Sequence, residues 1–233
     1  MLRLATMVAI ASAFAGSASA STISGTFDLN GSFTATSNTI TWTSNSAVAD
    51  QATIGNNVSG SFVSLGNTQA GIENLNFSTE PVGTSFAAQD FINFLSAPTF
   101  PALDITFIAP GFGGSAGCTA APAAVGQVCT PAGSPFTFTN APGGDSSVTF
   151  DFSGVTSDGK SSWNAIFTSQ FNESYQAVLA GLGSTGSFTG DYSDSNLVIT
   201  TTPVPVPGAG WLAFTGLLLL AAVGVRFQPG QSR

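Results

Sequence analysis

The side chains that could do chemistry in this sequence are mainly carboxylates and hydroxyls, because the chain contains no histidine. Without imidazole, the usual general base, the usual catalytic triad and most zinc or iron sites are excluded. A pair of carboxylates can still hydrolyse glycosides, and Glu73, Glu80 and Glu173 are the candidates for such a pair. Nothing in their local sequence distinguishes them, so solvated surface carboxylates are the favoured interpretation.

A second set of oxygen ligands lies in the segment GDYSDSN, which contains Asp191, Asp194 and Asn196. Hard oxygen ligands on a loop suit calcium, but the EF-hand spacing is absent and three ligands leave most of a calcium shell unfilled. An ordinary Asx-rich turn is therefore the favoured structure. Lys160, in TSDGKSSW, is more typical of a hydrated turn than of a catalytic base.

Four aromatic residues, Trp42, Trp163, Tyr175 and Tyr192, could form a platform on which sugar rings stack. Trp42 and Trp163 alternate with apolar neighbours, as core residues of strands do, so core positions are the favoured interpretation. Together with the missing histidine, these patterns predict a protein that has no catalytic site and needs no cofactor.

Cys118 and Cys129 are the two cysteines of the chain. In an oxidising compartment such a pair typically closes one loop, and the chain-entropy model gives a loop of this length about 3 kcal/mol of stability. A metal site would need further thiolate or imidazole ligands, and the chain has no imidazole. A disulfide is predicted.

Short β-strands are the elements that must position these residues. Apolar and polar residues alternate in several segments, which Gly, Asn, Ser and Pro separate. With no long helical period, this pattern predicts an antiparallel β-sandwich or jelly roll. The segments are TITW (39–42), DITFI (104–108), PFTFT (135–139), VTFDFS (148–153), SWNAIFTSQF (162–171) and NLVITT (196–201).

The segment TFDLNGSFTA (26–35) predicts a hairpin centred on Asn30-Gly31. A three-residue loop is preferred to a two-residue loop because it places the apolar side chains on one face. In TSFAAQDFINFLSAP (84–98) two structures stay open. Ala87, Phe91, Phe94 and Leu95 have helical spacing, whereas Phe91, Asn93 and Leu95 would line one face of a strand.

The first twenty residues, MLRLATMVAIASAFAGSASA, are typical of a secretory signal peptide. Arg3 precedes an apolar stretch, and Ala18-Ser19-Ala20 supplies small residues for cleavage before Ser21. The alternative is a buried N-terminal helix. A cleaved signal peptide is predicted, so residues 1–20 should not take part in the fold.

Near the other end, residues 209–225 form an apolar run without charge. As a helix this run would reach about 25 Å, near the lower limit for crossing a bilayer. A core helix would usually have a polar face, and this run has none, so a membrane helix is favoured over a core helix. Residues 203–208 contain three prolines and predict an extended linker. Arg226 follows the run, which places residues 226–233 in the cytoplasm and the domain outside it.

Charge is distributed unevenly between these parts. All twelve acidic residues lie in residues 21–202, where Lys160 is the one cation, so the formal charge there is −11. A charge of this size repels nucleic acid and anionic lipid surfaces. Disorder is less favoured than a folded domain because twenty phenylalanines are available for a core.

The C-terminal segment VPVPGAGWLAFTGLLLLAAVGVR (204–226) resembles the PEP-CTERM tail of exported bacterial proteins. Val204, Pro205 and Pro207 match the Val-Pro-Glu-Pro motif of that family, with Val206 at the usual Glu position. Thr215-Gly216-Leu217 resembles a common feature within the family's helix, and the basic cluster is reduced to Arg226.

This resemblance implies secretion by the general route and recognition of the tail by an exosortase, an integral-membrane transpeptidase-like enzyme. It also implies a link to exopolysaccharide and biofilm matrix in Gram-negative bacteria. The anchor would be centred on Leu217, Leu218, Leu219 and Leu220, followed by Arg226.

The sequence therefore predicts a signal peptide (1–20), a β-sandwich ectodomain (21–202), a linker (203–208), a membrane or sorting helix (209–225) and a short tail (226–233). The predicted role is structural or interactive, at the cell surface or in the matrix, with no nucleic-acid partner. One alternative is a glycan- or calcium-binding module that uses Asp191, Tyr192 and Asp194. A second is a carboxylate-based glycoside hydrolase.

Overall fold

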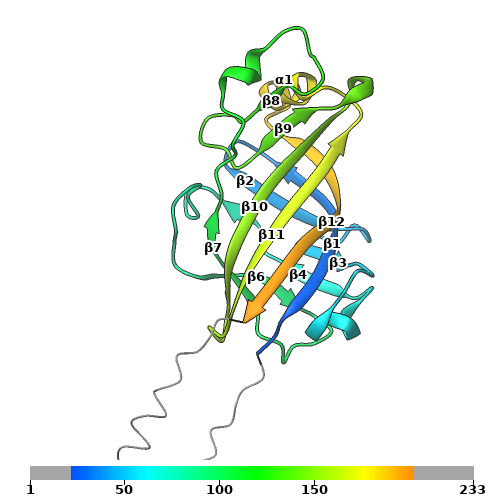
Figure 1. The fold of residues 1–233 in the computed structure, drawn as a ribbon, viewed down its shortest axis with the longest axis vertical. Helices are drawn as coiled ribbons and strands as arrows, with labels where there is room; N and C mark the ends of the chain where they lie inside the picture. The colour runs from blue at the N-terminus through cyan, green and yellow to red at the C-terminus, as the bar shows by residue number, and fades with distance from the viewer. Residues whose placement is uncertain (1–21, 202–233) are drawn as a thin grey trace, which may run out of the picture.

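The computed structural model describes residues 22–201, which form an antiparallel β-structure with one short α-helix (Figure 1). The predicted signal peptide, linker, membrane helix and tail, including Val204 to Pro207, Leu217 to Leu220 and Arg226, lie outside the described residues. The strands are β1 (Gly25–Ala35), β2 (Thr39–Ser44), β3 (Gln51–Ile54), β4 (Gln69–Ile72), β5 (Leu75–Asn76), β6 (Gln89–Phe94), β7 (Leu103–Ile108), β8 (Val128–Cys129), β9 (Thr137–Asn140), β10 (Ser146–Thr156), β11 (Ser161–Phe171) and β12 (Phe188–Thr201). The helices are α1 (Tyr175–Thr185) and the 3₁₀ segments η1 (Gly60–Leu65), η2 (Ala116–Thr119) and η3 (Pro142–Gly144).

Eight of the strands close into a barrel. Their order is β11-β12-β1-β3-β4-β6-β7-β10, and a ladder between β10 and β11 completes the ring. The predicted all-β antiparallel fold is confirmed, but a closed ring replaces the two separate sheets of the predicted sandwich. Closure pairs both edges of every strand in the ring, which removes open edges that would otherwise template aggregation.

Two strands of the barrel change partner partway along their length. The edge of β1 that meets β3 at Leu29 and Asn30 meets β2 from Gly31 onward. Likewise β10 pairs with β9 in its first part and with β7 in its last part. Each change of partner makes a fork, so β2 with β5, and β9 with β8, extend the sheet beyond the ring.

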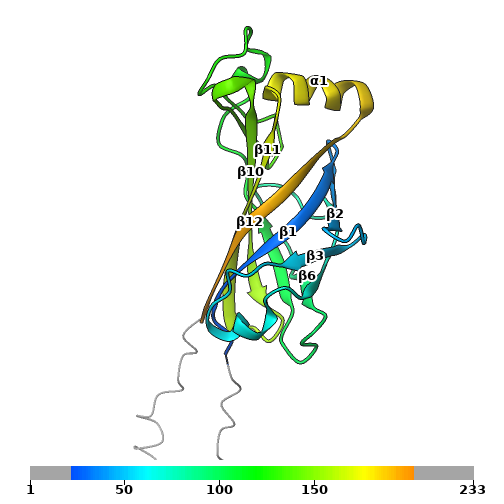
Figure 2. The same cartoon turned by 90° about the vertical axis from the view of Figure 1, so that its right-hand side faces the viewer.

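These forks give the molecule two different ends. Helix α1 and strands β8 and β9 lie at one end, called here the apical end (Figure 1). The described residues begin and finish at the opposite, basal end, where Gly25 on β1 pairs with Ile199 on β12. The long strands β10, β11, β12 and β1 connect the two ends (Figure 2).

One aromatic core fills the interior along its length. Near the basal end, the rings of Phe27 and Phe62 lie 4.8 Å apart. In the middle, Trp42 and Phe167 are 5.0 Å apart. Further aromatic pairs continue to the apical end of the molecule. Such pairs add stability beyond the area that they bury. The predicted inward residues Ile40, Trp42, Ile105, Phe136, Phe138, Val148, Phe150, Phe152, Trp163, Ala165, Phe167, Leu197 and Ile199 are buried, while Phe107 and Phe171 are partly exposed.

The hairpin predicted at Asn30-Gly31 is wrong, because β1 runs through both residues without turning. Glycine is needed there for close packing: a Cβ at Gly31 would lie 2.5 Å from the Thr43 carbonyl oxygen and 2.7 Å from the Tyr192 hydroxyl oxygen. The chain turns instead between β1 and β2, where the Thr36 N–H donates to the Thr39 carbonyl. The inner face of β1 does hold the four apolar residues that the three-residue loop would have placed on one face, Phe27, Leu29, Phe33 and Ala35.

In segment 84–98 the strand is confirmed and the helix is wrong. Strand β6 buries Phe91, Ile92 and Phe94, whereas Leu95 is 50% exposed. The inward face departs from the predicted alternation because the pairing with β7 shifts between Asp90 and Ile92. Such a bulge moves the following side chains to the other face of the strand.

Helix α1 was not predicted from the sequence. Its inner side consists of Tyr175 and Val178, which are buried, with Leu179 and Leu182 packed partly against the core. Gly186 ends the helix with a φ of 81°, and its N–H donates to the Leu182 carbonyl. The spacing of these four apolar residues is helical, but glycines within the segment obscure it, because glycine disfavours a helix.

Candidate functional site

A groove of about 450 Å³ opens at the fork where β1 changes its partner from β3 to β2. Strands β1, β2 and β12 supply most of its wall, and the turn after β2 closes one side. Its volume lies in the range typical of small-molecule sites. The lining residues are Asn30, Gly31, Ser32, Thr43, Ser44, Asn45, Ala47, Asp191 and Tyr192.

Tyr192 lies at the inner side of this groove. Its side chain is 1% exposed, and its hydroxyl has no hydrogen-bond partner within the described part of the chain. Burial raises the pKa of the Tyr192 phenol well above its usual range, so the hydroxyl keeps its proton. An unpaired buried hydroxyl costs about 1–3 kcal/mol, and native proteins rarely leave one without a partner.

Packing fixes the direction of that hydroxyl. The Tyr192 ring is perpendicular to the Trp42 ring at 5.5 Å and lies 5.4 Å from the Phe167 ring. Because Gly31 has no Cβ, the Tyr192 hydroxyl reaches the backbone of β1 on its inner face, and both residues belong to the lining of the groove. The sequence did not predict a site at four of the lining residues, Asn30, Ser32, Thr43 and Asn45. Only the Asn-Gly pair within an alternating pattern could have indicated that a site lies here.

The three weak calcium candidates are described only in part. Asp191 is exposed at the groove, whereas the side chains of Asp194 and Asn196 lie outside the described set. The predicted Asx-rich turn is wrong, since the whole segment belongs to β12. A bulge gives β12 one residue more than either neighbour between Tyr192 and Asn196. Among the described residues, no group of three or more acidic or cysteine side chains is placed to hold a metal ion.

The core positions favoured for Trp42 and Trp163 are confirmed, and the alternative of an aromatic platform is excluded because all four rings are buried. Trp42, Trp163, Tyr175 and Tyr192 are each exposed by 2% or less. Trp163 donates from Nε1 to the carbonyl oxygens of Asp104 and Val155, at 3.0 and 3.2 Å. A sugar ring therefore cannot stack on any of them without opening the core.

The three glutamates proposed for hydrolysis lie on separate segments. Glu73 follows β4 and Glu173 precedes α1, and both are exposed. Glu80 is buried, but its carboxylate accepts hydrogen bonds from the Asn76 N–H at 2.6 Å and the Thr79 hydroxyl at 2.8 Å. These bonds close a local turn, so Glu80 has a structural part in this fold.

Two other carboxylates do lie together, and sequence reasoning missed them. Asp90 on β6 and Asp104 on β7 are direct cross-strand partners. Burial, the Asp90 charge and a hydrogen bond between the two side chains raise the pKa of Asp104. The residues are well separated in sequence, so only the strand register reveals the pair.

Lys160 lies in the turn that joins β10 to β11, as predicted. Its ammonium is 3.6 Å from the Asp158 carboxylate. Burial acts to raise the pKa of Asp158, but hydrogen bonds from the Thr156 hydroxyl and the Lys160 N–H, together with the Lys160 charge, lower it overall. Asp158 is thereby held ionised, as suits a hydrated turn.

The segment GGSAG around Ser115 matches the G-x-S-x-G pattern of hydrolase nucleophiles. That pattern is meaningful when the serine sits on a sharp turn from a strand into a helix. Here Ser115 is exposed and precedes the 3₁₀ segment η2 within a loop, so this context is missing.

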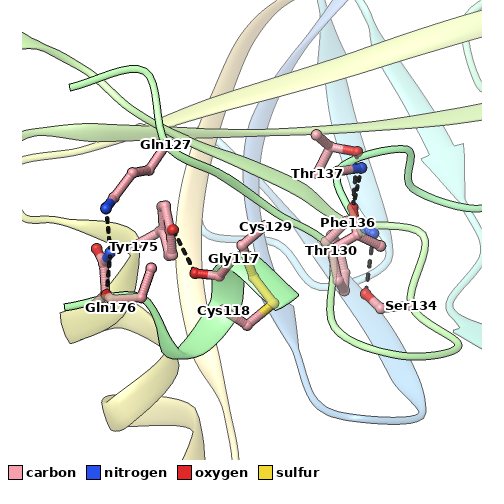
Figure 3. Close-up of a disulfide and its surroundings, with 12 residues drawn as sticks. Gly117, Cys118, Gln127, Cys129, Thr130, Ser134, Phe136, Thr137, Tyr175 and Gln176 are labelled. Carbon is pink, nitrogen blue, oxygen red and sulfur yellow. Dashed lines mark hydrogen bonds between the residues drawn. A yellow bond between two sulfur atoms is a disulfide. The ribbon is translucent and has the colours of Figure 1, made fainter. Parts of the chain in front are cut away.

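The predicted disulfide between Cys118 and Cys129 is confirmed, with Cα atoms 4.8 Å apart (Figure 3). It joins η2 to β8 beside helix α1. The Tyr175 hydroxyl donates to the Gly117 carbonyl at 2.8 Å, and Gln176 donates to Gln127 at 2.8 Å (Figure 3). The crosslinked loop therefore holds the start of α1 at the apical end.

Comparisons with known protein families, curated proteins and solved structures found no match to this chain. Within residues 22–201, no helix has the length and apolar character needed to cross a membrane.

Proposed function

We propose that this chain is an exported protein of the cell surface or extracellular matrix, with a structural or interaction role and no catalysis. The observation that carries the proposal is the disulfide, because such crosslinks persist in oxidising compartments and are rare in the cytosol. The signal-like first twenty residues and the PEP-CTERM-like tail support the same route. Sorting would then involve an exosortase-like enzyme of a Gram-negative bacterium.

The arrangement of the described ends supports display on a tether. Ile199 of β12 pairs with Gly25 of β1 at the basal end, so the first and last strands of the described chain have their outer ends side by side. A sorting helix at residues 209–225 would follow that end after the proline-rich segment. The apical end and the groove would then be exposed to the space outside the membrane.

The experiment tests the tail and the body together. Replacing Leu218 with Arg should cost about 3 kcal/mol of membrane insertion, and deleting residues 204–233 should remove the anchor. Both proteins should leave the membrane fraction and appear in the medium, with circular dichroism showing a folded barrel. Leu218→Ala is the control that should stay in the membrane fraction.

The proposal fails if the deleted protein is unfolded, because residues 204–233 would then belong to the core. It fails also if Leu218→Arg remains in the membrane fraction to the same extent as Leu218→Ala. The intact mass of the protein recovered from its host would report whether each end has been processed.

A second candidate function, binding of a glycan or of calcium, is favoured by one observation. Asp191 and Tyr192, two of the three residues predicted for such a module, both line the groove. The calcium part is tested by measuring the melting temperature with and without millimolar calcium chloride. A rise that Asp191→Asn abolishes would support it.

A further inference from the structure

We propose that the groove between β1, β2 and β12 binds one or two units of a neutral, hydroxyl-rich saccharide. This inference rests on the second candidate function and commits it to one ligand class. The Tyr192 hydroxyl, Asp191 and the amides of the groove would contact the sugar hydroxyls. The export and display of the chain do not depend on it.

The volume of the groove argues against a lone cation. A calcium ion inside an oxygen shell of about 2.4 Å radius fills roughly 60 Å³, whereas the groove holds about 450 Å³. Calcium also favours several carboxylates, and Asp191 is the one carboxylate among the described lining residues. The space instead fits a ligand with the dimensions of a mono- or disaccharide.

The lining selects for hydroxyl groups and against negative charge. Asparagine amides and serine and threonine hydroxyls both donate and accept hydrogen bonds, as a sugar hydroxyl does. Among the described lining residues there is no cation to pair with an acidic sugar, while Asp191 and the charge of −11 on residues 21–202 would repel one. A neutral sugar meets neither penalty.

The unpaired Tyr192 hydroxyl supplies an independent indication. It is buried and protonated, and neighbouring rings hold it against the inner side of Gly31, which lines the groove. A buried polar group without a partner in the protein is expected to find one in a ligand or water. After a small shift of β1 at Gly31, a sugar hydroxyl in the groove would accept this hydrogen bond.

Affinity for a single unit should be low, since the aromatic rings near the groove are buried and offer no stacking surface. Binding would rest on hydrogen bonds that replace bonds to water, and each contributes little net free energy. A millimolar dissociation constant is expected, and repeated units of a polysaccharide presented to many displayed copies would raise the effective affinity.

The two tyrosines of the chain make a matched pair for the test. Tyr192→Phe removes an unpaired hydroxyl, so it should weaken saccharide binding about three- to tenfold while leaving the melting temperature unchanged or higher. Tyr175→Phe removes a hydroxyl that donates to the Gly117 carbonyl at 2.8 Å. It should lower the melting temperature and leave binding unchanged.

The measurement is saturation-transfer-difference NMR on the full chain, purified in a detergent without a sugar headgroup. The probes are maltotriose, cellotriose and laminaritriose, with trigalacturonate as the anionic comparison. Asp191→Asn tests the groove charge, and Asp145→Asn, at an exposed site before β10, is its control.

Transfer to a neutral trisaccharide that Tyr192→Phe and Asp191→Asn weaken, and both controls retain, supports the proposal. Binding that survives both groove variants places the sugar elsewhere and overturns it. Preferential binding of trigalacturonate overturns the neutral class but leaves the glycan-binding function standing. No transfer to any probe, or a calcium-dependent melting shift lost in Asp191→Asn without sugar binding, also overturns it.

Discussion

Asp90 and Asp104 face each other across β6 and β7, which places two carboxylates at one cross-strand position. Like charges in this arrangement are unfavourable by up to about 1 kcal/mol. Burial raises the pKa of Asp104 first, and the charge of Asp90 and their hydrogen bond raise it further. Asp104 therefore binds its proton more tightly in the folded state than in the unfolded state.

The sign of the pH effect follows from that shift. The favourable contribution of Asp104 to folding is complete below the ordinary carboxyl pKa and is lost as pH rises through the raised value. Asp104→Asn should therefore increase the free energy of unfolding at pH 7 by about 0.5–1 kcal/mol, and the gain should shrink towards pH 3. Urea denaturation at both pH values measures this, with the exposed Asp145→Asn as control. Equal gains at pH 7 and pH 3 would contradict the explanation.

Burial also decides which predicted residues can meet a ligand. Trp42 and Trp163 belong to the core, so their rings stabilise the barrel and cannot bind sugar at its surface. Tyr175 and Tyr192 are buried to the same degree, yet only the Tyr175 hydroxyl has a partner in the described structure. The sequence does not reveal this difference, and the unpaired Tyr192 hydroxyl is what supports a ligand site at the groove.

At the scale of elements, the crosslinked loop between β7 and β9 and helix α1 depend on each other. The disulfide closes a loop with a sequence separation of 11, and Gln176 of α1 donates to Gln127 and to the Ala120 carbonyl within it. Without the crosslink, these bonds would have to order a longer flexible segment. The apical end should then be the first part of the barrel to open.

Replacing Cys118 and Cys129 together with Ala should lower the free energy of unfolding by about 3 kcal/mol. Hydrogen exchange should rise at η2 and α1 more than at the central strands β11 and β12. Guanidinium denaturation and exchange mass spectrometry measure the two effects. A reducing agent should destabilise the parent protein and leave the double variant unchanged. If exchange rises equally throughout, the crosslink acts on the whole barrel and the local explanation is wrong.

At the scale of the whole molecule, charge is the dominant asymmetry. Twelve carboxylates and one lysine occupy residues 21–202, and the lysine already pairs with Asp158. Self-repulsion of this kind favours expanded states and keeps the folded protein dispersed. The same charge should keep the protein away from anionic surfaces.

Salt should therefore stabilise the barrel at neutral pH. Raising sodium chloride from 10 to 150 mM shortens the Debye length from about 30 to about 8 Å. Each kcal/mol of repulsion screened should raise the melting temperature by about 2–4 °C. Calorimetry at pH 7 measures the rise, which should fall away near pH 3 where the carboxylates are neutral. A melting temperature that does not change with salt at pH 7 would mean that the charges lie too far apart to matter.

The sequence by itself determined the features that depend on local residue patterns and on composition. Alternation of apolar residues located the strands around Trp42, Phe150 and Trp163, because one face of each strand must be buried. Two cysteines allowed one intramolecular pairing, and that pairing is present. The missing histidine excluded whole classes of chemistry through composition alone, because no fold can supply an imidazole that the chain lacks.

Only the tertiary structure decided how these strands associate. Strand β1 pairs with β12, and Thr34 contacts Thr189 across 155 positions of sequence. Such partners are chosen by the packing of the shared core, which no local window contains. For this reason the closed barrel, the straight course of β1 through Asn30-Gly31, the Asp90–Asp104 pair and the groove at the fork appear only when distant strands are brought together.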